Sequence, residues 1–377
     1  MRFGIKHRHR LSLAAALFIA AAPLPAHTTG MRAAATNGSA AVEAYVRART
    51  AFETEASAYW KDIADKRRAR IAKRRSKETI GLDDYVLTQP PLYTGPPRPP
   101  DMPSDKEPGP PPERIPVIAD FLKAAAEQYG FVPDRASEAQ FKQAYAKVAS
   151  AAGLTREQAV RVYAFETGGN GTYDGQAGLP SAGGRKEGRP ISPAIGYNQL
   201  LTTNSIGLLA ENGDKFVAAL KANGVADKKI EALKKMVAFS RSVPNAWSEH
   251  DKLGKTTPGG MSIHAAVLDR DIGPLLQTQK LLDSVVYARA NGYKQTLTAG
   301  ELELMNFTGD GNGFDMVLMP QELRDKVPTS NFFQRGGYER NPIARRTGTV
   351  ANLVGSIEAK MDQLSKAPGA KELGDAF

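Results

Sequence analysis

One acidic side chain lies on the inward face of a predicted helix. Three apolar residues are spaced to form a single stripe along this helix: Ala159, Val162 and Tyr163. Glu166 occupies the next position of the stripe, where burial and the negative end of the helix dipole both favour the neutral carboxyl group. A carboxyl group that stays protonated near neutral pH is the proton donor that glycosidic bond cleavage requires. The structural alternative is a salt bridge from Glu166 to a core arginine, either Arg161 or Arg135.

The helix that carries Glu166 has a start signal and a stop signal. Thr155 followed by Gln158 has the spacing of a capping box, which predicts the start of a helix. Gly168 and Gly169 then predict its end. These signals leave about three turns of helix and put Glu166 in the last of them.

Three short motifs follow one another along the chain. They are F-E-T-G-G-N at 165–170, G-Y-N-Q-L-L at 196–201 and E-L-M-N-F-T-G at 303–309. In this order they resemble the soluble lytic transglycosylase family, whose motifs run E-S-G-x-N, G-L-M-Q-L-M and A-Y-N-A-G. The resemblance spans roughly residues 112–364. It implies an all-α, lysozyme-like domain, related to goose-type lysozymes, that cleaves the MurNAc–GlcNAc β-1,4 bond of peptidoglycan and forms a 1,6-anhydro product.

The resemblance also assigns roles to single residues. It implies that Glu166 is the catalytic general acid and base. The positions that it implies for substrate binding are Thr167, Tyr197, Asn198, Gln199 and Asn306. No cofactor and no metal ion is expected.

The chain departs from the family pattern in three places. Residues 171–188 lengthen the stretch between Glu166 and Gln199. Tyr197 and Asn198 replace the usual Leu and Met, and Met305 stands where the family has a tyrosine. The loss of that hydroxyl group is expected to affect efficiency more than the class of reaction.

The first 26 residues have the pattern of a secretory signal peptide. Four basic residues precede the uncharged stretch 11–22, and a Pro-Leu-Pro-Ala segment ends at Ala26. That stretch is too short for a mature membrane anchor, and no second apolar run of about 20 residues follows. We therefore expect a periplasmic or secreted protein without a transmembrane anchor. The chain contains no cysteine, so disulfides and a lipoprotein anchor are excluded.

The positive charge of the chain is concentrated in two places. The formal net charge is +10, of which residues 1–30 carry +4 and residues 61–78, with nine basic and three acidic side chains, carry +6. The rest of the chain has no basic excess, so nucleic acid is not expected as a partner. The stretch 66–75, from Lys66 to Arg75, is considered either as a contact with an anionic envelope surface or as a solvated helix face.

Composition and the family resemblance together predict five segments along the chain, the resemblance giving the identity of the large domain. They are a signal peptide (1–26), a basic helical arm (27–87), a Pro-rich linker (88–116), a lysozyme-like transglycosylase domain (117–366) and a flexible tail (367–377). The linker prediction rests on twelve prolines, which exclude regular helix and favour an extended spacer. Within the large domain, helices are predicted at 117–129, 137–152, 200–210, 215–222, 227–239, 272–290 and 350–364, besides a short capped one ending at Gly309. The run D-G-N-G-F-D at 310–315 is predicted to be a turn, because it lacks the ligands of a calcium loop.

Two other functions remain open on the sequence alone. A goose-type lysozyme on the same fold needs a second carboxylate to activate water, for which Asp174, Glu187 and Asp310 are candidates. A non-catalytic peptidoglycan-binding scaffold is the other, with Met305 and the long insertion in its favour. His250 and His264 lack the spacing of metallohydrolase or serine hydrolase motifs and are interpreted as surface or core residues.

Overall fold

The chain is helical wherever the structure describes it. The computed structural model describes residues 40–100, 102, 114–179 and 188–377, and their regular elements are all helices. Besides them only isolated β-bridges occur in these residues, so the expected all-α class is confirmed there. Three expected features lie outside the described residues: the signal peptide (1–26), the start of the arm (27–39) and most of the second half of the linker (101 and 103–113). None of the described helices combines the length and apolar character needed to cross a membrane.

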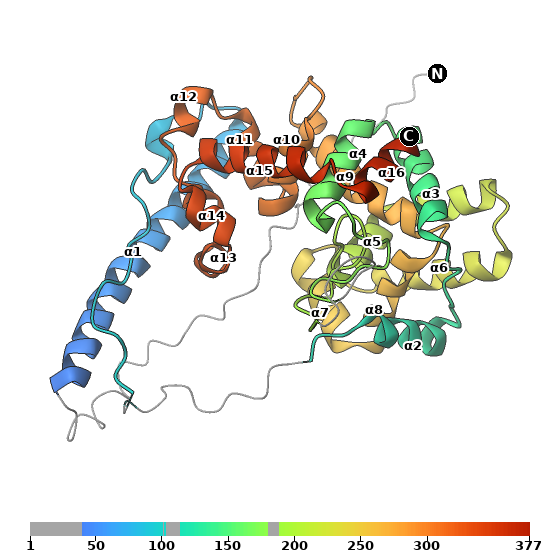
Figure 1. Cartoon of the computed structure of the whole chain (residues 1–377), viewed down its shortest axis with the longest axis horizontal. Helices are drawn as coiled ribbons and strands as arrows, with labels where there is room; N and C mark the ends of the chain where they lie inside the picture. The colour runs from blue at the N-terminus through green and yellow to red at the C-terminus, as the bar shows by residue number, and fades with distance from the viewer. Residues whose placement is uncertain (1–39, 101, 103–113, 180–187) are drawn as a thin grey trace, which may run out of the picture. The chain divides into compact units, whose positions relative to one another are not determined.

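The chain divides into two compact units (Figure 1). The first contains Ile115–Val317 and Ile357–Phe377, and the second combines Leu318–Ser356 with the described part of Ile19–Arg114. The predicted arm is therefore not a separate element, because residues 318–356 of the predicted catalytic domain pack with it. Sequence composition did not reveal this grouping, which joins segments more than 200 residues apart.

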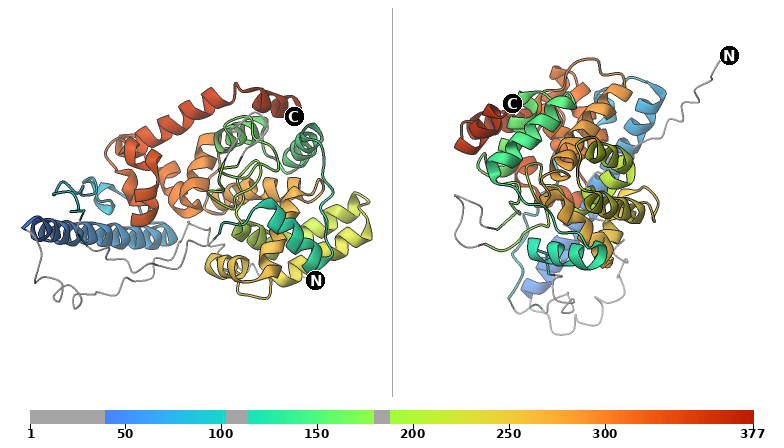
Figure 2. Two further views of the ribbon diagram at one scale, coloured as in Figure 1. Left: turned by 60° about the horizontal axis from the view of Figure 1, so that its bottom comes forward. Right: turned by 90° about the vertical axis from the view of Figure 1, so that its right-hand side faces the viewer.

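The first unit is a helical assembly around an apolar core. Its helices are α2 (Ile118–Tyr129), α3 (Glu138–Ala151), α4 (Arg156–Thr167), α5 (Thr202–Ala222), α6 (Asp227–Ser240), α7 (Trp247–Thr256), α8 (Pro258–Ile263), η2 (His264–Leu268), α9 (Gly273–Ala290), α10 (Ala299–Thr308), α11 (Asp310–Leu318, ending at the unit boundary), the second part of α15 (Val350–Leu364) and α16 (Pro368–Asp375). Helices α5 and α6 pack against each other as a hairpin (Figure 2), and α2 lies against α8. Apolar residues of α2, α5, α6, η2 and α9 fill the core between them.

Two helices predicted at 200–210 and 215–222 form the single helix α5. The prediction was wrong at residues 211–214, which include Gly213 and continue the helix. In the structure, a Cβ atom at Gly213 would collide with the side chain of Val237 in α6. The glycine therefore serves the close approach of two helices, and α5 continues through it.

The predicted turn at 310–315 is instead the start of helix α11. Gly309, with φ +82°, ends α10, and the chain then begins a new helix at once. A Cβ atom at Gly313 would meet the backbone of Met305. Gly313 therefore allows α10 and α11 to pack closely.

Residues 367–377, predicted to be a flexible tail, contain the docked helix α16. Its Ala370 and Leu373 are fully buried. Glu372 accepts a hydrogen bond from the buried Lys142 at 2.6 Å, and the carbonyl of Gly374 accepts one from Arg156 Nε at 2.7 Å. These contacts with α3 and α4 explain why the terminus is ordered.

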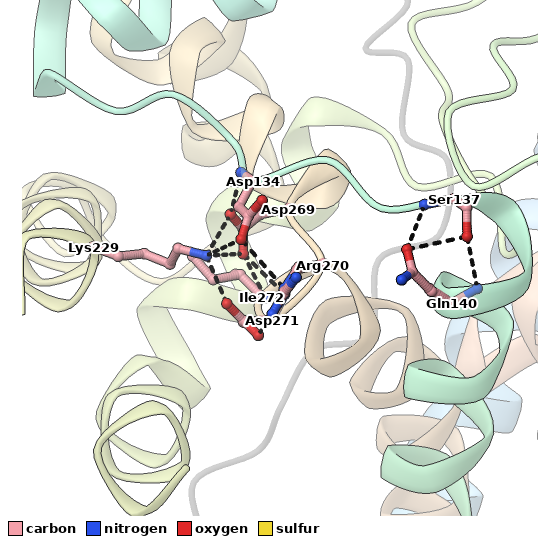
Figure 3. Close-up of polar contacts among 8 residues, drawn as sticks. All are labelled: Asp134, Ser137, Gln140, Lys229, Asp269, Arg270, Asp271 and Ile272. Atoms are coloured by element: carbon pink, nitrogen blue, oxygen red, sulfur yellow. Dashed lines mark hydrogen bonds and ion pairs between the residues drawn. The ribbon is translucent and has the colours of Figure 1, made fainter. Parts of the chain in front are cut away.

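A buried carboxylate joins three segments of the first unit (Figure 3). Asp269 is fully buried and accepts hydrogen bonds from the backbone N–H of Asp134 at 2.8 Å and of Asp271 at 2.9 Å. Lys229 of α6 lies 3.0 Å from the same carboxylate. Asp269 thus fixes the start of α9 against α6 and the segment before α3.

His264 is a core residue with both ring nitrogens engaged. Its Nδ1 lies 2.9 Å from Ser205 Oγ, and its Nε2 lies 2.9 Å from the carbonyl of Pro193. The ring also packs edge-on against Phe121 with a centroid distance of 4.9 Å. Burial lowers the pKa of His264 to about 4, although the Pro193 carbonyl opposes this shift.

His264 is expected to make the fold sensitive to acid. The unfolded histidine, with a pKa of 6.5, takes up a proton that the folded one refuses until about pH 4. The stabilisation is therefore complete above pH 6.5 and is lost as the pH falls toward 4, by roughly 3 kcal/mol. Urea unfolding of wild type and His264→Gln from pH 7 to 4 measures this loss. The variant should lose less stability on acidification, and parallel curves would contradict the assignment.

The second unit is organised along the long helix α1 (Ala40–Ser76). The other elements in its described part are η1 (Leu82–Asp84), α12 (Gln321–Arg324), η3 (Thr329–Phe332), α13 (Arg335–Arg340), α14 (Pro342–Thr347) and the first part of α15. The buried Asn331 connects two segments of this unit through Val86. Its Nδ2 donates to the carbonyl of Val86 at 2.8 Å, and its Oδ1 accepts from the N–H of Val86 at 2.9 Å. Within the helical arm predicted at 27–87, helix α1 spans Ala40–Ser76.

Several basic side chains of α1 are directed into this unit. Arg70 is fully buried and donates to the carbonyls of Asp84 and Asn331, both at 2.9 Å. Arg67 donates to the carbonyl of Phe333, and Lys66 to that of Asp83 at 2.7 Å. Lys73 forms a salt bridge with Asp84. Four of the residues considered for contact with an anionic surface therefore make hydrogen bonds or salt bridges within the protein.

The described first half of the predicted linker runs back along α1 (Figure 1). The ring of Tyr93 packs edge-on against Phe52 with a centroid distance of 5.5 Å. The guanidinium of Arg49 lies 5.2 Å from the centre of the same ring. This part of the Pro-rich segment is extended, as expected, but it packs on the helix instead of spanning free space.

Candidate active site

Helix α4 places Glu166 by local signals that the sequence contains. Thr155 Oγ1 accepts the N–H of Gln158 at 3.1 Å, and Gln158 Oε1 accepts the N–H of Thr155 at 2.9 Å. The helix ends at Gly168, whose φ of +71° is left-handed. Both predicted boundaries are confirmed, and Glu166 lies in the last turn.

The residues after Glu166 hold this helix end against the C-terminal helices. A Cβ atom at Gly169, which has φ +77°, would collide with the carbonyl oxygen of Leu364 in α15. Asn170 Oδ1 accepts the N–H of Gly369 in α16 at 3.0 Å. The G-G-N part of the first motif therefore fixes the end of α4 in the unit.

Glu166 is joined to the third motif by a direct hydrogen bond. Asn306 Nδ2 donates to Glu166 Oε1 at 2.6 Å, across 140 residues of sequence. Asn306 lies near the end of α10, which starts at a capping box of Thr298 and Glu301 and ends at Gly309. The ends of α4 and α10 thus meet at this pair of side chains.

The surroundings of Glu166 favour its protonated form. Its side chain keeps part of its surface accessible to solvent but is densely enclosed by protein atoms, and this burial raises its pKa. Lys280 of α9 and Lys360 of α15 oppose the rise by their charge, and hydrogen bonds from Glu303 and Asn306 oppose it further. Lys360 is held nearby, with Nζ 3.8 Å from the ring centre of Phe165. The carboxyl group therefore stays protonated to a higher pH than an ordinary glutamate.

Neither arginine of the structural alternative pairs with Glu166. Arg161 forms salt bridges with Glu358 and Asp362 of α15. Arg135 pairs with Asp174 and donates to Tyr173 Oη at 2.8 Å. Glu166 is thus free of the arginine salt bridge that would have made it purely structural.

Two residues predicted to bind substrate are buried in the core instead. Tyr197 has 0% of its surface exposed and donates to Glu138 Oε1 at 2.6 Å. Asn198 is also buried, and its Nδ2 donates to the carbonyl of Gln277 at 2.8 Å. Gly196 makes this arrangement possible, because a Cβ atom there would overlap the Gln277 amide. The prediction failed because the motif gives the order of residues along a turn, not the side that each faces.

The other predicted binding residues lie closer to the surface. Thr167 is partly exposed, but its hydroxyl donates to the carbonyl of Tyr163 in its own helix at 2.7 Å. Gln199 is partly exposed and has φ +43°, a conformation that is rare and strained for a side chain other than glycine. Its Nε2 donates to the carbonyl of Gly196 at 2.8 Å. Met305, which replaces the family's tyrosine, is fully buried.

Sequence reasoning missed Glu303, a second carboxyl group beside Glu166. Glu303 is only 1% exposed, and among the described residues its Oε2 has no hydrogen-bond partner. Burial, and then the like charge of Glu166, raise its pKa well above the ordinary value. A signal existed, because Glu303 lies three residues before Asn306 and therefore on the same face of α10.

The site contains carboxyl, amide and ammonium groups. In the described part of the chain, no group of three or more His, Asp or Glu side chains is arranged to hold a metal ion. The arrangement suits proton transfer by Glu166, with Asn306 fixing one of its oxygens. Comparison of the chain with protein-family models, with curated proteins and with solved structures gave no match.

Proposed function

We propose that this protein is a periplasmic or secreted peptidoglycan lytic transglycosylase with a lysozyme-like catalytic domain. One observation carries the proposal. Glu166, partly exposed in the last turn of α4, is hydrogen-bonded at 2.6 Å to Asn306 near the end of α10. Both residues belong to motifs that resemble the family. Their surroundings raise the pKa of Glu166, as a general acid needs.

The reaction uses one carboxyl group in two steps. Glu166 first donates its proton to the glycosidic oxygen, and the bond from that oxygen to the anomeric carbon of MurNAc breaks. Glu166, now a carboxylate, then accepts the proton of the 6-hydroxyl of the same sugar. As this proton leaves, the oxygen of the 6-hydroxyl bonds to the anomeric carbon. The proton count of the enzyme is restored, and no water is consumed.

Asn306 is expected to orient the acid through this cycle. Its Nδ2 donates to Glu166 Oε1 and so restricts the orientation of the carboxyl group. Gln199, partly exposed on its strained turn, is the remaining polar side chain of the second motif available for sugar amide or hydroxyl groups.

A goose-type lysozyme mechanism has less support. Asp174 is paired with Arg135, Asp310 accepts a hydrogen bond from Ser284 at 2.6 Å, and Glu187 lies outside the described residues. Glu303 is hydrogen-bonded to Glu166, whereas a water-activating carboxylate must stand roughly 6.5–9.5 Å from the acid to leave room for water.

Product analysis tests the proposal. Purified peptidoglycan incubated with the protein should release muropeptides with 1,6-anhydro ends, detected by mass spectrometry. Reducing ends in the products would assign the protein to the lysozyme class. Binding to insoluble peptidoglycan without release would favour the scaffold.

A further inference from the structure

We propose that Glu166 and Glu303 share one proton and act together as a single acid, with Glu303 as a positioning residue. This inference rests on the proposed function and concerns the same site. Helix α10 supplies both partners of Glu166: Asn306 contacts it at 2.6 Å, and Glu303 precedes Asn306 by three residues on the same helix face.

The contact between the two glutamates requires a proton. Their side chains are hydrogen-bonded to each other, yet two carboxylates offer only acceptor atoms. Glu303 is 1% exposed, and no donor among the described residues reaches its Oε2. An unpaired buried charge at this place would be strongly unfavourable, so a neutral carboxyl group on one partner is the favoured state.

The charged neighbours fit a pair with one negative charge. Lys280 of α9 and Lys360 of α15 both face Glu166, and Lys360 also faces Glu303. Glu166 and Glu303 themselves come from α4 and α10. Burial raises the pKa of both carboxyl groups, and two such close groups lose their protons in two separate steps that belong to the pair.

This sharing has a consequence for catalysis. The second proton of the pair is held against the charge of the other carboxylate, so it remains bound up to a higher pH than a lone glutamate would hold it. When Glu166 gives this proton to the glycosidic oxygen, two carboxylates remain beside the sugar. Their charge favours the positive charge that develops on the sugar ring.

The test is the pH dependence of muropeptide release by the purified protein and by Glu303→Gln. The glutamine of this variant mimics a permanently neutral partner, so Glu166 should lose its proton at lower pH. The high-pH limb of the activity profile is expected to move down by at least about one pH unit, with activity regained in acid. Glu301→Gln, in the same helix, is the matched control, because glutamine also serves in a capping box. An unchanged limb in Glu303→Gln overturns the proposal.

A second measurement separates this inference from the proposed function. Carboxyl carbons of the two glutamates are followed by NMR titration of the ¹³C-Glu-labelled protein, with Glu166→Gln and Glu303→Gln for assignment. Each variant should lower the titration midpoint of the remaining partner. If wild type releases nothing at any pH, the proposed function fails while this titration still decides the pair. Midpoints that do not respond to loss of the partner overturn the sharing, whatever the activity.

Discussion

Glu166→Gln is expected to reduce the release of anhydro-muropeptides by at least about 10⁴-fold, the upper end of the usual contribution of general acid–base catalysis. Glutamine keeps the size of the side chain and can still contact Asn306, but it cannot donate and regain a proton. In the proposed mechanism one carboxyl group serves both steps, so both are lost together. Glu303 is too deeply buried to replace it, with 1% of its surface exposed.

This experiment needs a variant that changes charge but not chemistry. Glu157→Gln is suitable, because Glu157 lies exposed in the first turn of the same helix α4. It should retain wild-type release, and both variants should keep the helical circular dichroism and the binding to insoluble peptidoglycan. Substantial release by Glu166→Gln would remove Glu166 from the catalytic role.

Local signals in the sequence predicted helix boundaries well. The capping box of Thr155 and the glycine at 168 set both ends of α4, and Thr298 sets the start of α10. Such signals work because their partners lie within a few residues. Gly213 and Gly313 are the opposite case, since the atoms that surround them come from other helices and cannot be predicted from the local sequence.

Charge patterning was the least reliable guide. The basic stretch of α1 left open a contact with an anionic partner or a solvated helix face, yet Arg67 and Arg70 donate to backbone carbonyls more than 250 residues away. A lysine or arginine near the end of a helix looks the same in sequence whether it meets solvent or a buried carbonyl. Only the packing of residues 318–356 along α1 distinguishes the two.

The arrangement of the candidate site was predicted in part. The motif order groups Glu166 with Asn306, and these two side chains are hydrogen-bonded, whereas Glu303 was passed over although helix periodicity places it beside Asn306. In the turn at 196–201 the error was to predict buried side chains as substrate-binding ones. It arose because no periodicity indicates which side chains of a turn face inward. Tyr197 and Asn198 therefore needed the three-dimensional structure.

Tyr197→Ala is expected to destabilise the first unit by about 3–5 kcal/mol, as truncation of a large buried aromatic side chain does. The ring is packed edge-on by Tyr163 at 4.9 Å and by Phe141 at 5.5 Å between centroids. Its hydroxyl donates to Glu138 Oε1 at 2.6 Å, so alanine leaves both a cavity and a partly buried carboxylate with one donor fewer. Tyr197→Phe keeps the ring and should lose about 1.5–3 kcal/mol, the usual value of a hydrogen bond to a charged group.

Urea unfolding of the two variants and wild type measures these losses. At low temperature and without urea, where Tyr197→Phe remains folded, its release of muropeptides should stay close to wild type, because the residue lies in the core. A substrate-binding role makes the reverse prediction: unfolding free energies near wild type and a raised KM for peptidoglycan. That outcome would return Tyr197 to the surface of the site and would require the 196–201 turn to adopt a different arrangement from the one in which Gln277 fills the space beside Gly196.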